Sequence, residues 1–230
     1  MNTILHQLKS KGLLWQGSVQ AQQPRATGVV GDWLAAHIPG GLSGHPVIAI
    51  HSPAGIGELR LLLPNLQANG ADNSKLLVWI APPHKPGAEA LQANGFALNR
   101  LLIIHPPEPQ QALWAAEQCL KSGACHSVLL WHDKLSVAQL QRLQQAARQG
   151  LAQLFFLCRA ATLSLSLPVS LSIGLQPQPQ GLIVTVQKCR GSWPPPPFML
   201  NMSKLWPQLS LTATSSERNS VVTFPGSRAS

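Results

Sequence analysis

A glycine-containing segment between a predicted strand and a predicted helix is the place where this chain could bind phosphate. Residues 46–51 form an apolar run typical of a buried strand, and residues 58–69, which precede Gly70, indicate a helix. A Walker A loop occupies the same context and needs a Lys for the phosphates and a Ser or Thr for Mg²⁺. The segment consists of Ser52, Pro53, Ala54, Gly55, Ile56, Gly57 and Glu58. Glu58 and Leu59 stand where that Lys and hydroxyl belong, so we expect no cofactor, no catalytic residue and no enzyme activity.

Four histidines lie at or just past the ends of predicted strands, and imidazole is a common ligand of zinc, copper and nickel. They are His51, His84, His105 and His132. Ligands of an open parallel sheet bind outside the carboxyl ends of its strands, so these rings could share one edge. However, strand ends are also where polar residues normally begin, and Asp133 is the one carboxylate or thiol with suitable spacing. We therefore predict no metal site.

Strand-like and helical patterns alternate along the middle of the chain, which predicts an α/β fold. The apolar runs are at residues 46–51, 75–81, 100–105, 126–131 and 152–158. The helical segments are at residues 58–69, 86–94, 108–122 and 136–149. Continuous apolar runs favour a mostly parallel sheet with helices on both faces. Residues 169–173 and 182–187 are joined too closely for a crossover helix, so we expect antiparallel strands at one edge.

The composition divides the chain into three parts. Residues 1–45 are predicted to be a helical or extended segment, with a helix at 29–37, and residues 46–188 form the core. Residues 189–230 carry four consecutive prolines and many Ser and Thr, so we expect a flexible tail. Apolar anchors and nearby cations suggest that this region binds a partner, unless it folds back onto the core. The candidate partner-binding residues are Trp193, Phe198, Trp206, Lys188, Arg190 and Lys204.

The charge and the cysteines limit the partners and the compartment. A net charge of +9 favours nucleic acid, an acidic protein surface or an anionic membrane, although a generally basic surface without a specific ligand is the alternative. The four cysteines show no CxxC spacing, and most of them lie in apolar patterns typical of reduced thiols. No segment reaches the roughly 20 apolar residues of a membrane span. We expect a cytoplasmic protein with no membrane partner.

Several segments in the right order resemble proteins of the RecA superfamily. Residues 77–131 resemble the ATPase core of RecA. Closer similarity, to the ImuA group of SulA-related, RecA-like proteins, is carried by Trp79–His84, Ala112–Gln118 and Leu120–Cys125. Leu14–Gly17 resembles the N-terminal "Val-Trp-Arg-Gly" of that group, with Gln16 in place of the Arg. The resemblance covers about residues 10–190 and implies a RecA-like, P-loop NTPase-like core.

Three functional positions of RecA are occupied by residues that cannot replace them. The phosphate-binding pair falls at Glu58 and Leu59, as described above. The catalytic carboxylate falls near Pro83, and the Walker B Asp falls at Trp131, with Asp133 two positions too late. Phosphoryl transfer depends on positioned positive charge and Mg²⁺, so the resemblance implies a degenerate nucleotide site.

The resemblance implies an interaction protein of the SOS DNA-damage response. The leading hypothesis is a non-catalytic adaptor that supports error-prone translesion DNA synthesis through contacts with RecA and an ImuB-like polymerase-related protein. Residues 159–166 replace a RecA loop that contacts DNA, and their single Arg implies weak DNA contact at most. The alternative is a SulA-like cell-division inhibitor that binds FtsZ. A second alternative is an active RecA-like ATPase, against which Glu58, Pro83 and Trp131 argue.

Overall fold

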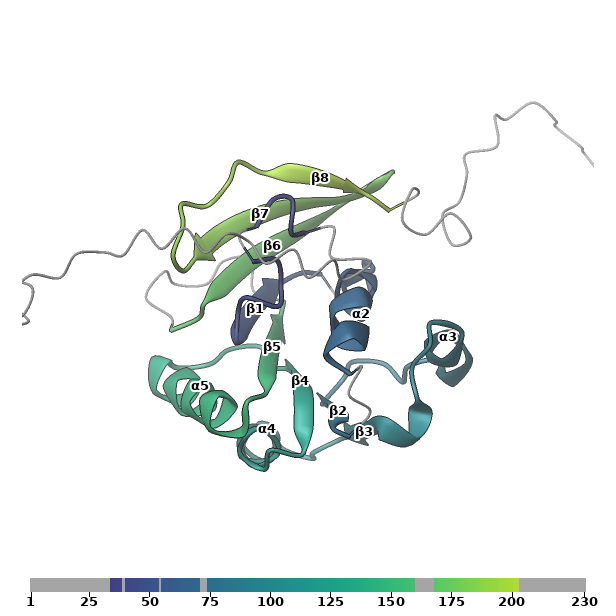
Figure 1. Ribbon diagram of the computed structural model, residues 1–230, viewed down its shortest axis with the longest axis vertical. Helices are drawn as coiled ribbons and strands as arrows, with labels where there is room; N and C mark the ends of the chain where they lie inside the picture. The colour runs from purple at the N-terminus through teal and green to yellow at the C-terminus, as the bar shows by residue number, and fades with distance from the viewer. Residues whose placement is uncertain (1–33, 39, 54, 71–73, 160–167, 203–230) are drawn as a thin grey trace, which may run out of the picture.

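One mainly parallel sheet organises the protein. The computed structural model describes residues 34–38, 40–53, 55–70, 74–159 and 168–202, and within them eight strands form a sheet in the order β3-β2-β4-β5-β1-β6-β7-β8 (Figure 1). The strands are β1 (Val47–His51), β2 (Leu76–Ile80), β3 (Leu101–Ile104), β4 (Cys125–Trp131), β5 (Gln153–Cys158), β6 (Leu171–Gln178), β7 (Gly181–Cys189) and β8 (Phe198–Asn201). The strands from β3 to β6 in this order are parallel, and β7 and β8 are antiparallel to their neighbours.

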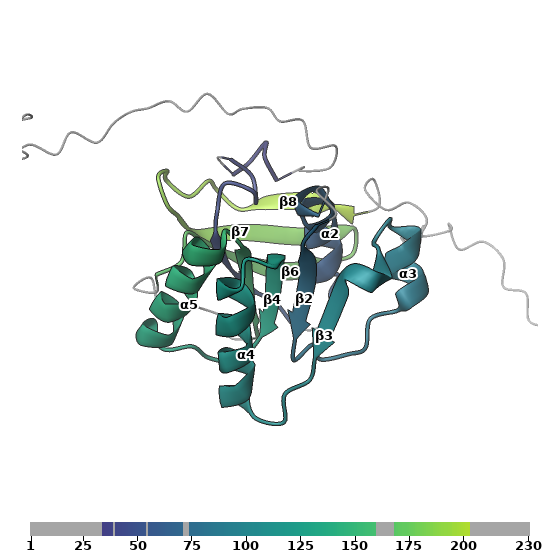
Figure 2. The same cartoon turned by 60° about the horizontal axis from the view of Figure 1, so that its bottom comes forward.

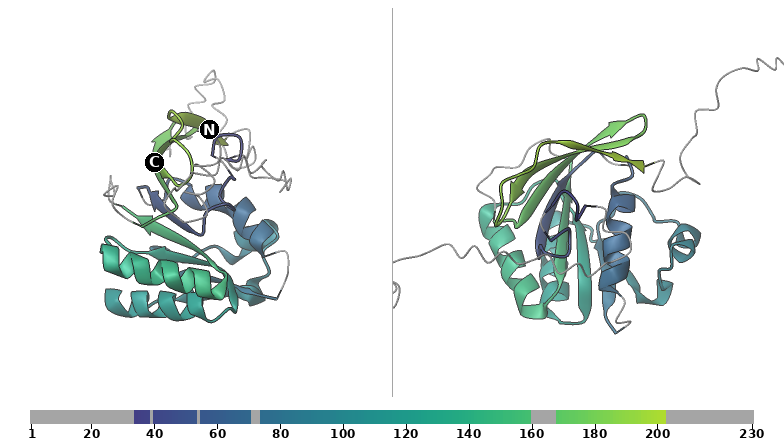
Figure 3. Two further views of the ribbon diagram at one scale, coloured as in Figure 1. Left: turned by 60° about the vertical axis from the view of Figure 1, so that its left-hand side comes forward. Right: turned by 45° about the horizontal axis from the view of Figure 1, so that its top comes forward.

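Helices cover both faces of the sheet, so the sheet is the middle layer. The helices are α2 (Glu58–Asn69), α3 (Ala88–Ala93), α4 (Pro109–Lys121), α5 (Val137–Gly150) and the 3₁₀ turn η1 (Leu98–Arg100). Buried residues of α2 and α3 belong to one apolar cluster, and those of α4 and α5 belong to a second cluster. Helices α4 and α5 lie side by side on their face (Figures 2 and 3). This coverage explains why the central strands are apolar on both sides.

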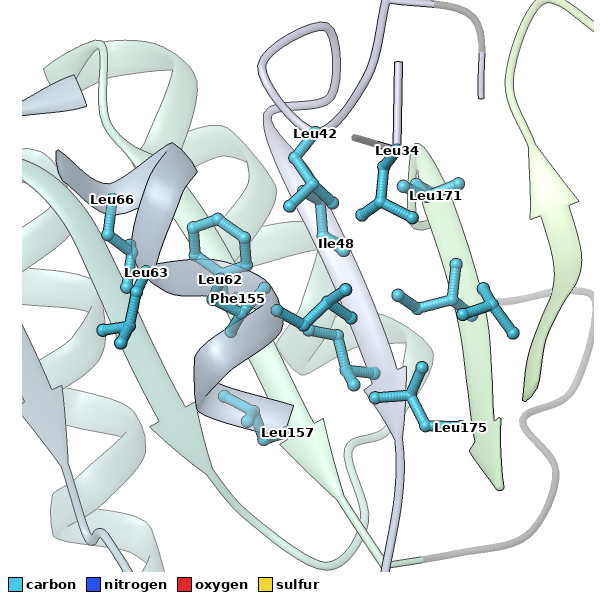
Figure 4. Packing of buried hydrophobic residues seen from close by; sticks show 14 of the residues in the cluster. Leu34, Leu42, Ile48, Leu62, Leu63, Leu66, Phe155, Leu157, Leu171 and Leu175 are labelled. Atoms are coloured by element: carbon cyan, nitrogen blue, oxygen red, sulfur yellow. The ribbon is translucent and has the colours of Figure 1, made fainter. Parts of the chain in front are cut away.

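The central strands send alternate side chains to the two clusters. Ile48 and Ile50 of β1 lie in the first cluster, and Val47 and Ala49 lie in the second. In β5, Phe155 and Leu157 join the first cluster (Figure 4), while Leu154 and Phe156 join the second. These side chains are at most 3% exposed, because successive residues of a strand point to opposite faces and both faces are covered. The predicted α/β fold with a mainly parallel sheet and antiparallel strands is confirmed.

The first residues of the described chain pack on the core. This corrects two expectations about residues 1–45, namely a helix at 29–37 and a core that begins only at residue 46. Residues 34–37 form turns in place of the helix expected at 29–37, whose other residues lie outside the described chain. Leu34, Ile38 and Leu42 are nevertheless at most 1% exposed and belong to the first cluster. Gln153 Nε2 of β5 donates hydrogen bonds to the carbonyl oxygens of Leu42 at 2.7 Å and His45 at 2.8 Å. Leu34, Ile38 and Leu42 are therefore part of the core.

The expected flexible tail contains a strand, so its boundary at residue 189 is wrong. Phe198–Asn201 forms β8, which pairs with β7 from Gly181 to Val184. The four prolines at 194–197 lie before this strand, where their missing amide hydrogens remove no bond of the ladder. Leu200 is 6% exposed in the first cluster, so burial of apolar side chains stabilises the added strand. Residues 203–230 lie outside the described chain.

A buried carboxylate joins α4 to α5. Glu117 Oε1 lies 2.5 Å from Lys121 Nζ one turn along α4, and its Oε2 lies 2.6 Å from Arg142 Nη2 on α5. The hydrogen bond from Lys121 is the largest cause that holds the pKa of Glu117 below its usual value of 4.5, and the charges of Arg142 and Lys121 add to it against the opposing effect of burial. The ionised form is therefore the one that the fold stabilises.

Glu117→Gln is expected to lower the free energy of unfolding by about 1 kcal/mol at pH 7, because both cationic partners are partly exposed and solvent weakens the pairs. Since folding lowers the pKa of Glu117, its contribution is present above about pH 4.5 and is lost as the pH falls through the folded-state pKa. Urea unfolding at pH 7 and pH 3.5 measures this change. Glu89→Gln on the exposed side of α3 is the control, and an equal effect of Glu117→Gln at both pH values would contradict the assignment.

Candidate binding site at the carboxyl edge of the sheet

The degenerate loop connects β1 to the start of α2, as the sequence predicts. Gly55 and Gly57 have φ angles of 80° and 96°, which place them in the left-handed region that favours glycine. Gly57 is the N-cap of α2 and supplies no side-chain hydrogen bond to it. Glu58 is the first helical residue, and its Oε1 accepts a hydrogen bond of 3.4 Å from the backbone amide of Gly55. Ala54 lies outside the described residues.

Glu58 turns into the protein and borders two adjoining cavities of about 370 and 260 Å³. Only 6% of the residue is exposed, and its Oε2 has no hydrogen-bond partner within the described residues. Pro83 and Trp131, which occupy the other two degenerate positions, line both cavities as well. The three positions that the sequence places at the nucleotide site therefore meet at one edge of the sheet.

The larger cavity is acidic although the chain as a whole is basic. Glu58, Glu108 and Asp133 line it together with a single Arg, Arg159. Neither Lys nor Thr lines it among the described residues, and Ser52 is its one described hydroxyl-bearing residue. A carboxylate at the start of α2 repels a phosphate, which a helix N-terminus would otherwise attract. The arrangement can accept hydrogen bonds from a cation, and its described residues offer a triphosphate no Lys.

The four histidines do not assemble into a metal site. His51 Nδ1 lies 3.2 Å from Cys158 Sγ in the interior, because the last residues of β1 and β5 are partners in the parallel ladder. His132 lines the larger cavity and His84 lines the smaller one, whereas His105 is exposed and lines neither. Within the part of the chain that the structure describes, no group of three His, Cys, Asp or Glu side chains could hold a metal ion. The pairing of His51 with Cys158 was missed, because the sequence does not reveal which strands are neighbours.

The candidate partner-binding residues of the C-terminal region do not form one exposed cluster. Trp193 is 93% exposed, but Phe198 is half-buried in β8 and stacks on His37 with ring centroids 3.9 Å apart. Phe198 therefore packs on the core and is not a free anchor. Lys188 is the next-to-last residue of β7, and Arg190 follows this strand on the surface. Trp206 and Lys204 lie outside the described residues.

The opposite edge of the sheet carries a basic cavity of about 540 Å³. Lys75, His126 and Arg148 line it near the amino ends of β2, β4 and β5, and none of the described residues around it is acidic. Burial, followed by the nearby charge of Lys75, lowers the pKa of His126, so this ring is neutral at pH 7. Lys75 and Arg148 then carry the charge. The two edges of the sheet thus differ in electrostatic character.

The fold and the acidic cavity define a class of mixed α/β protein with one mainly parallel sheet and a carboxylate, Glu58, at the start of the helix that follows β1. The family described as "Cell division inhibitor SulA" matches residues 51–153, from the end of β1 to the start of β5. The cell division inhibitor SulA of Edwardsiella piscicida is 36% identical over 92 residues, which are 40% of this chain and 55% of that protein. The SulA of Pseudomonas aeruginosa is 30% identical over 116 residues, which are 46% of this chain and 72% of that protein. The chain belongs to the SulA family.

A crystal structure of SulA from Pseudomonas aeruginosa also matches, with 30% sequence identity and a TM-score of 0.42, and the match covers 48% of this chain and 96% of that one. The chain spans about half the length of most of the curated relatives it matches. It covers 55% of the SulA of Edwardsiella piscicida and 54% of the SulA of Pectobacterium carotovorum. Across the described residues, no helix combines the length and the apolar character that crossing a membrane requires.

Proposed function

We propose that this protein inhibits cell division by binding FtsZ and blocking its polymerisation. The similarity to SulA relatives across residues 51–153 carries this proposal, since those relatives are cell division inhibitors. The acidic cavity supports a mechanism without nucleotide hydrolysis, because Glu58 stands where a phosphate-binding Lys would be needed. Inhibition by occupancy of a partner surface needs no chemical step. Inhibition of cell division therefore replaces the translesion adaptor as the leading hypothesis.

Expression of the protein from a promoter that does not respond to DNA damage is expected to produce filamentous cells with intact, regularly spaced chromosomes. In the matching experiment with purified components, an equimolar amount of the protein should reduce the FtsZ that sediments with GTP at least threefold. A substitution that leaves the protein folded but abolishes its effect on FtsZ would identify a residue of the contact surface. Cells of normal length together with unchanged FtsZ sedimentation would contradict the proposal.

The translesion adaptor remains the second candidate function. Elements outside the matched residues 51–153 favour it, since Leu34, Ile38 and Leu42 and strands β6 to β8 are built into the fold and extend beyond the family match. In this proposal the RecA-like body is catalytically inactive and contacts RecA and an ImuB-like protein. Affinity purification after DNA damage, with partners identified by mass spectrometry, separates the two functions. Recovery of RecA and an ImuB-like protein without FtsZ would favour the adaptor.

A further inference from the structure

The buried carboxylate at the start of α2 is the feature of this molecule that most requires a ligand. Only 6% of Glu58 is exposed, and its Oε2 accepts no hydrogen bond from the described residues. A buried acceptor without a partner costs about 1–3 kcal/mol, and more when the group is charged. The cost falls when a hydrogen-bond donor enters the cavity, so the site favours a ligand that brings an N–H group.

The surrounding charges select a cationic donor. Three of the chain's eight acidic residues, Glu58, Glu108 and Asp133, line the larger cavity and outnumber its single Arg159. Both ion pairs found among the described residues belong to Glu117 on another face, so none of these three carboxylates is neutralised in that way. A cation gains from this potential, and a phosphate or carboxylate loses.

The aromatic residues between the two cavities suit a guanidinium group. Trp131 lines both cavities and packs edge-to-face against Trp79, with ring centroids 5.7 Å apart. Guanidinium binds carboxylates through parallel N–H groups and stacks on aromatic rings, and it loses hydration more readily than ammonium. The volume of about 370 Å³ also falls within the roughly 300–1,000 Å³ of small-ligand sites.

A second unpaired atom indicates that the guanidinium belongs to a peptide. Trp79 is 1% exposed, lines the smaller cavity, and its Nε1 has no acceptor within the described residues. A guanidinium group cannot accept this hydrogen bond, but a main-chain carbonyl beside it can. Arg60 and Lys85 line the same smaller cavity, which disfavours a second cation there and favours an oxygen acceptor such as a carbonyl group.

We propose that these two adjoining cavities bind an arginine side chain presented by a peptide segment of a protein partner. The guanidinium occupies the larger cavity against Glu58 and Trp131, and a carbonyl of the same segment accepts from Trp79 Nε1. This proposal goes beyond the inhibition of cell division. Peptide binding at this site is measured on the purified protein without FtsZ, so its failure would be distinguishable from failure of the proposed function.

The test uses the full chain and the peptide acetyl-Gly-Arg-Gly-amide, with the citrulline peptide as a neutral isostere. We expect the arginine peptide to shift the indole N–H resonances of Trp79 and Trp131 saturably in NMR titrations, and the citrulline peptide to bind at least tenfold more weakly. Butylguanidine, which has the guanidinium but no main-chain carbonyl and no second charge, should bind without shifting the Trp79 indole resonance to the same extent. Equal binding of the arginine and citrulline peptides would overturn the proposal.

Glu58→Gln is expected to weaken arginine-peptide binding at least tenfold. The variant keeps the shape of the side chain and replaces the carboxyl group by a neutral amide, so the fold is retained, and circular dichroism with thermal unfolding verifies this. Glu89→Gln, which removes an exposed charge from α3, is the matched control and should leave binding unchanged. Peptide binding by Glu58→Gln at wild-type affinity, or no saturable shift at millimolar peptide, would also overturn the assignment.

Discussion

Gly150→Ala is expected to lower the free energy of unfolding by about 3 kcal/mol, at the upper end of the usual cost of overpacking. Gly150 is the last residue of α5, and a Cβ added there would overlap the carbonyl oxygen of Leu120 near the end of α4. It would also lie 3.2 Å from the backbone nitrogen of Gly123. These are backbone atoms of a packed helix end, so they cannot rotate away as a flexible side chain would.

The thermal unfolding midpoint measures this effect, and for a chain of 230 residues the expected loss lowers it by roughly 6–12 °C. Gly87→Ala is the matched control, because its added Cβ would meet only Ala90 Cβ at an ordinary distance of 3.7 Å. The control should change stability by no more than about 0.5 kcal/mol. If the two variants unfolded at the same temperature, the close packing of α5 against the end of α4 would be wrong.

Phe155→Ala is expected to cost about 3–5 kcal/mol, because it removes a large side chain from the centre of the sheet. Phe155 is fully buried, and its neighbours in the ladder are Ile48 of β1 and Leu129 of β4. Its ring lies in the same apolar cluster as Leu62 of α2 (Figure 4). Rigid strands on both sides prevent the fold from closing around the missing ring, so a cavity remains.

Equilibrium unfolding in guanidinium chloride measures this loss. Phe155→Leu should cost only about 1 kcal/mol, because most of the apolar volume is retained. Leu151→Ala, at a residue that is 83% exposed just before β5, should be nearly neutral. A Phe155→Ala variant as stable as Leu151→Ala would contradict the central position of β5.

Both destabilising variants bear on the proposed inhibition of division. Natural proteins are stable by only about 5–15 kcal/mol, so a loss of 3–5 kcal/mol raises the unfolded fraction that proteases remove. The expected result in cells is weaker filamentation through lower abundance. Purified, folded variants should still reduce FtsZ sedimentation below their unfolding temperatures, which separates stability from binding.

The chemistry of the candidate site could be predicted in part. The sequence identifies Glu58 at the start of a helix after a glycine-bearing turn, and this follows from local patterns that extend over a few residues. Its burial and the unpaired Oε2 depend on Pro83, Trp131 and the other walls of the cavities, which come from distant strands. The acidic character of the larger cavity therefore required the tertiary structure.

The strands and helices between residues 46 and 158 could be read from the sequence, because an apolar run or a 3.6-residue period is a property of consecutive residues. The order of the strands could not be read in this way. Strand β1 lies between β5 and β6, and its residues are a hundred positions or more from theirs. The strand β8 was missed for a related reason. Four residues after a run of prolines carry little local signal, and pairing with β7 and burial against the core make them a strand.

The sequence by itself determined that this is an α/β protein with a carboxylate, Glu58, at the start of the helix after a glycine-bearing turn, because residue identity and local periodicity establish both. Only the tertiary structure decided that Leu34, Ile38, Leu42 and Leu200 belong to the core. It also decided that residues 198–201 pair with β7 and that His51 meets Cys158. It also decided that three of the acidic residues, Glu58, Glu108 and Asp133, gather at one edge of the sheet. These features arise from contacts between segments far apart in the chain, and such contacts depend on which strands lie side by side in the sheet.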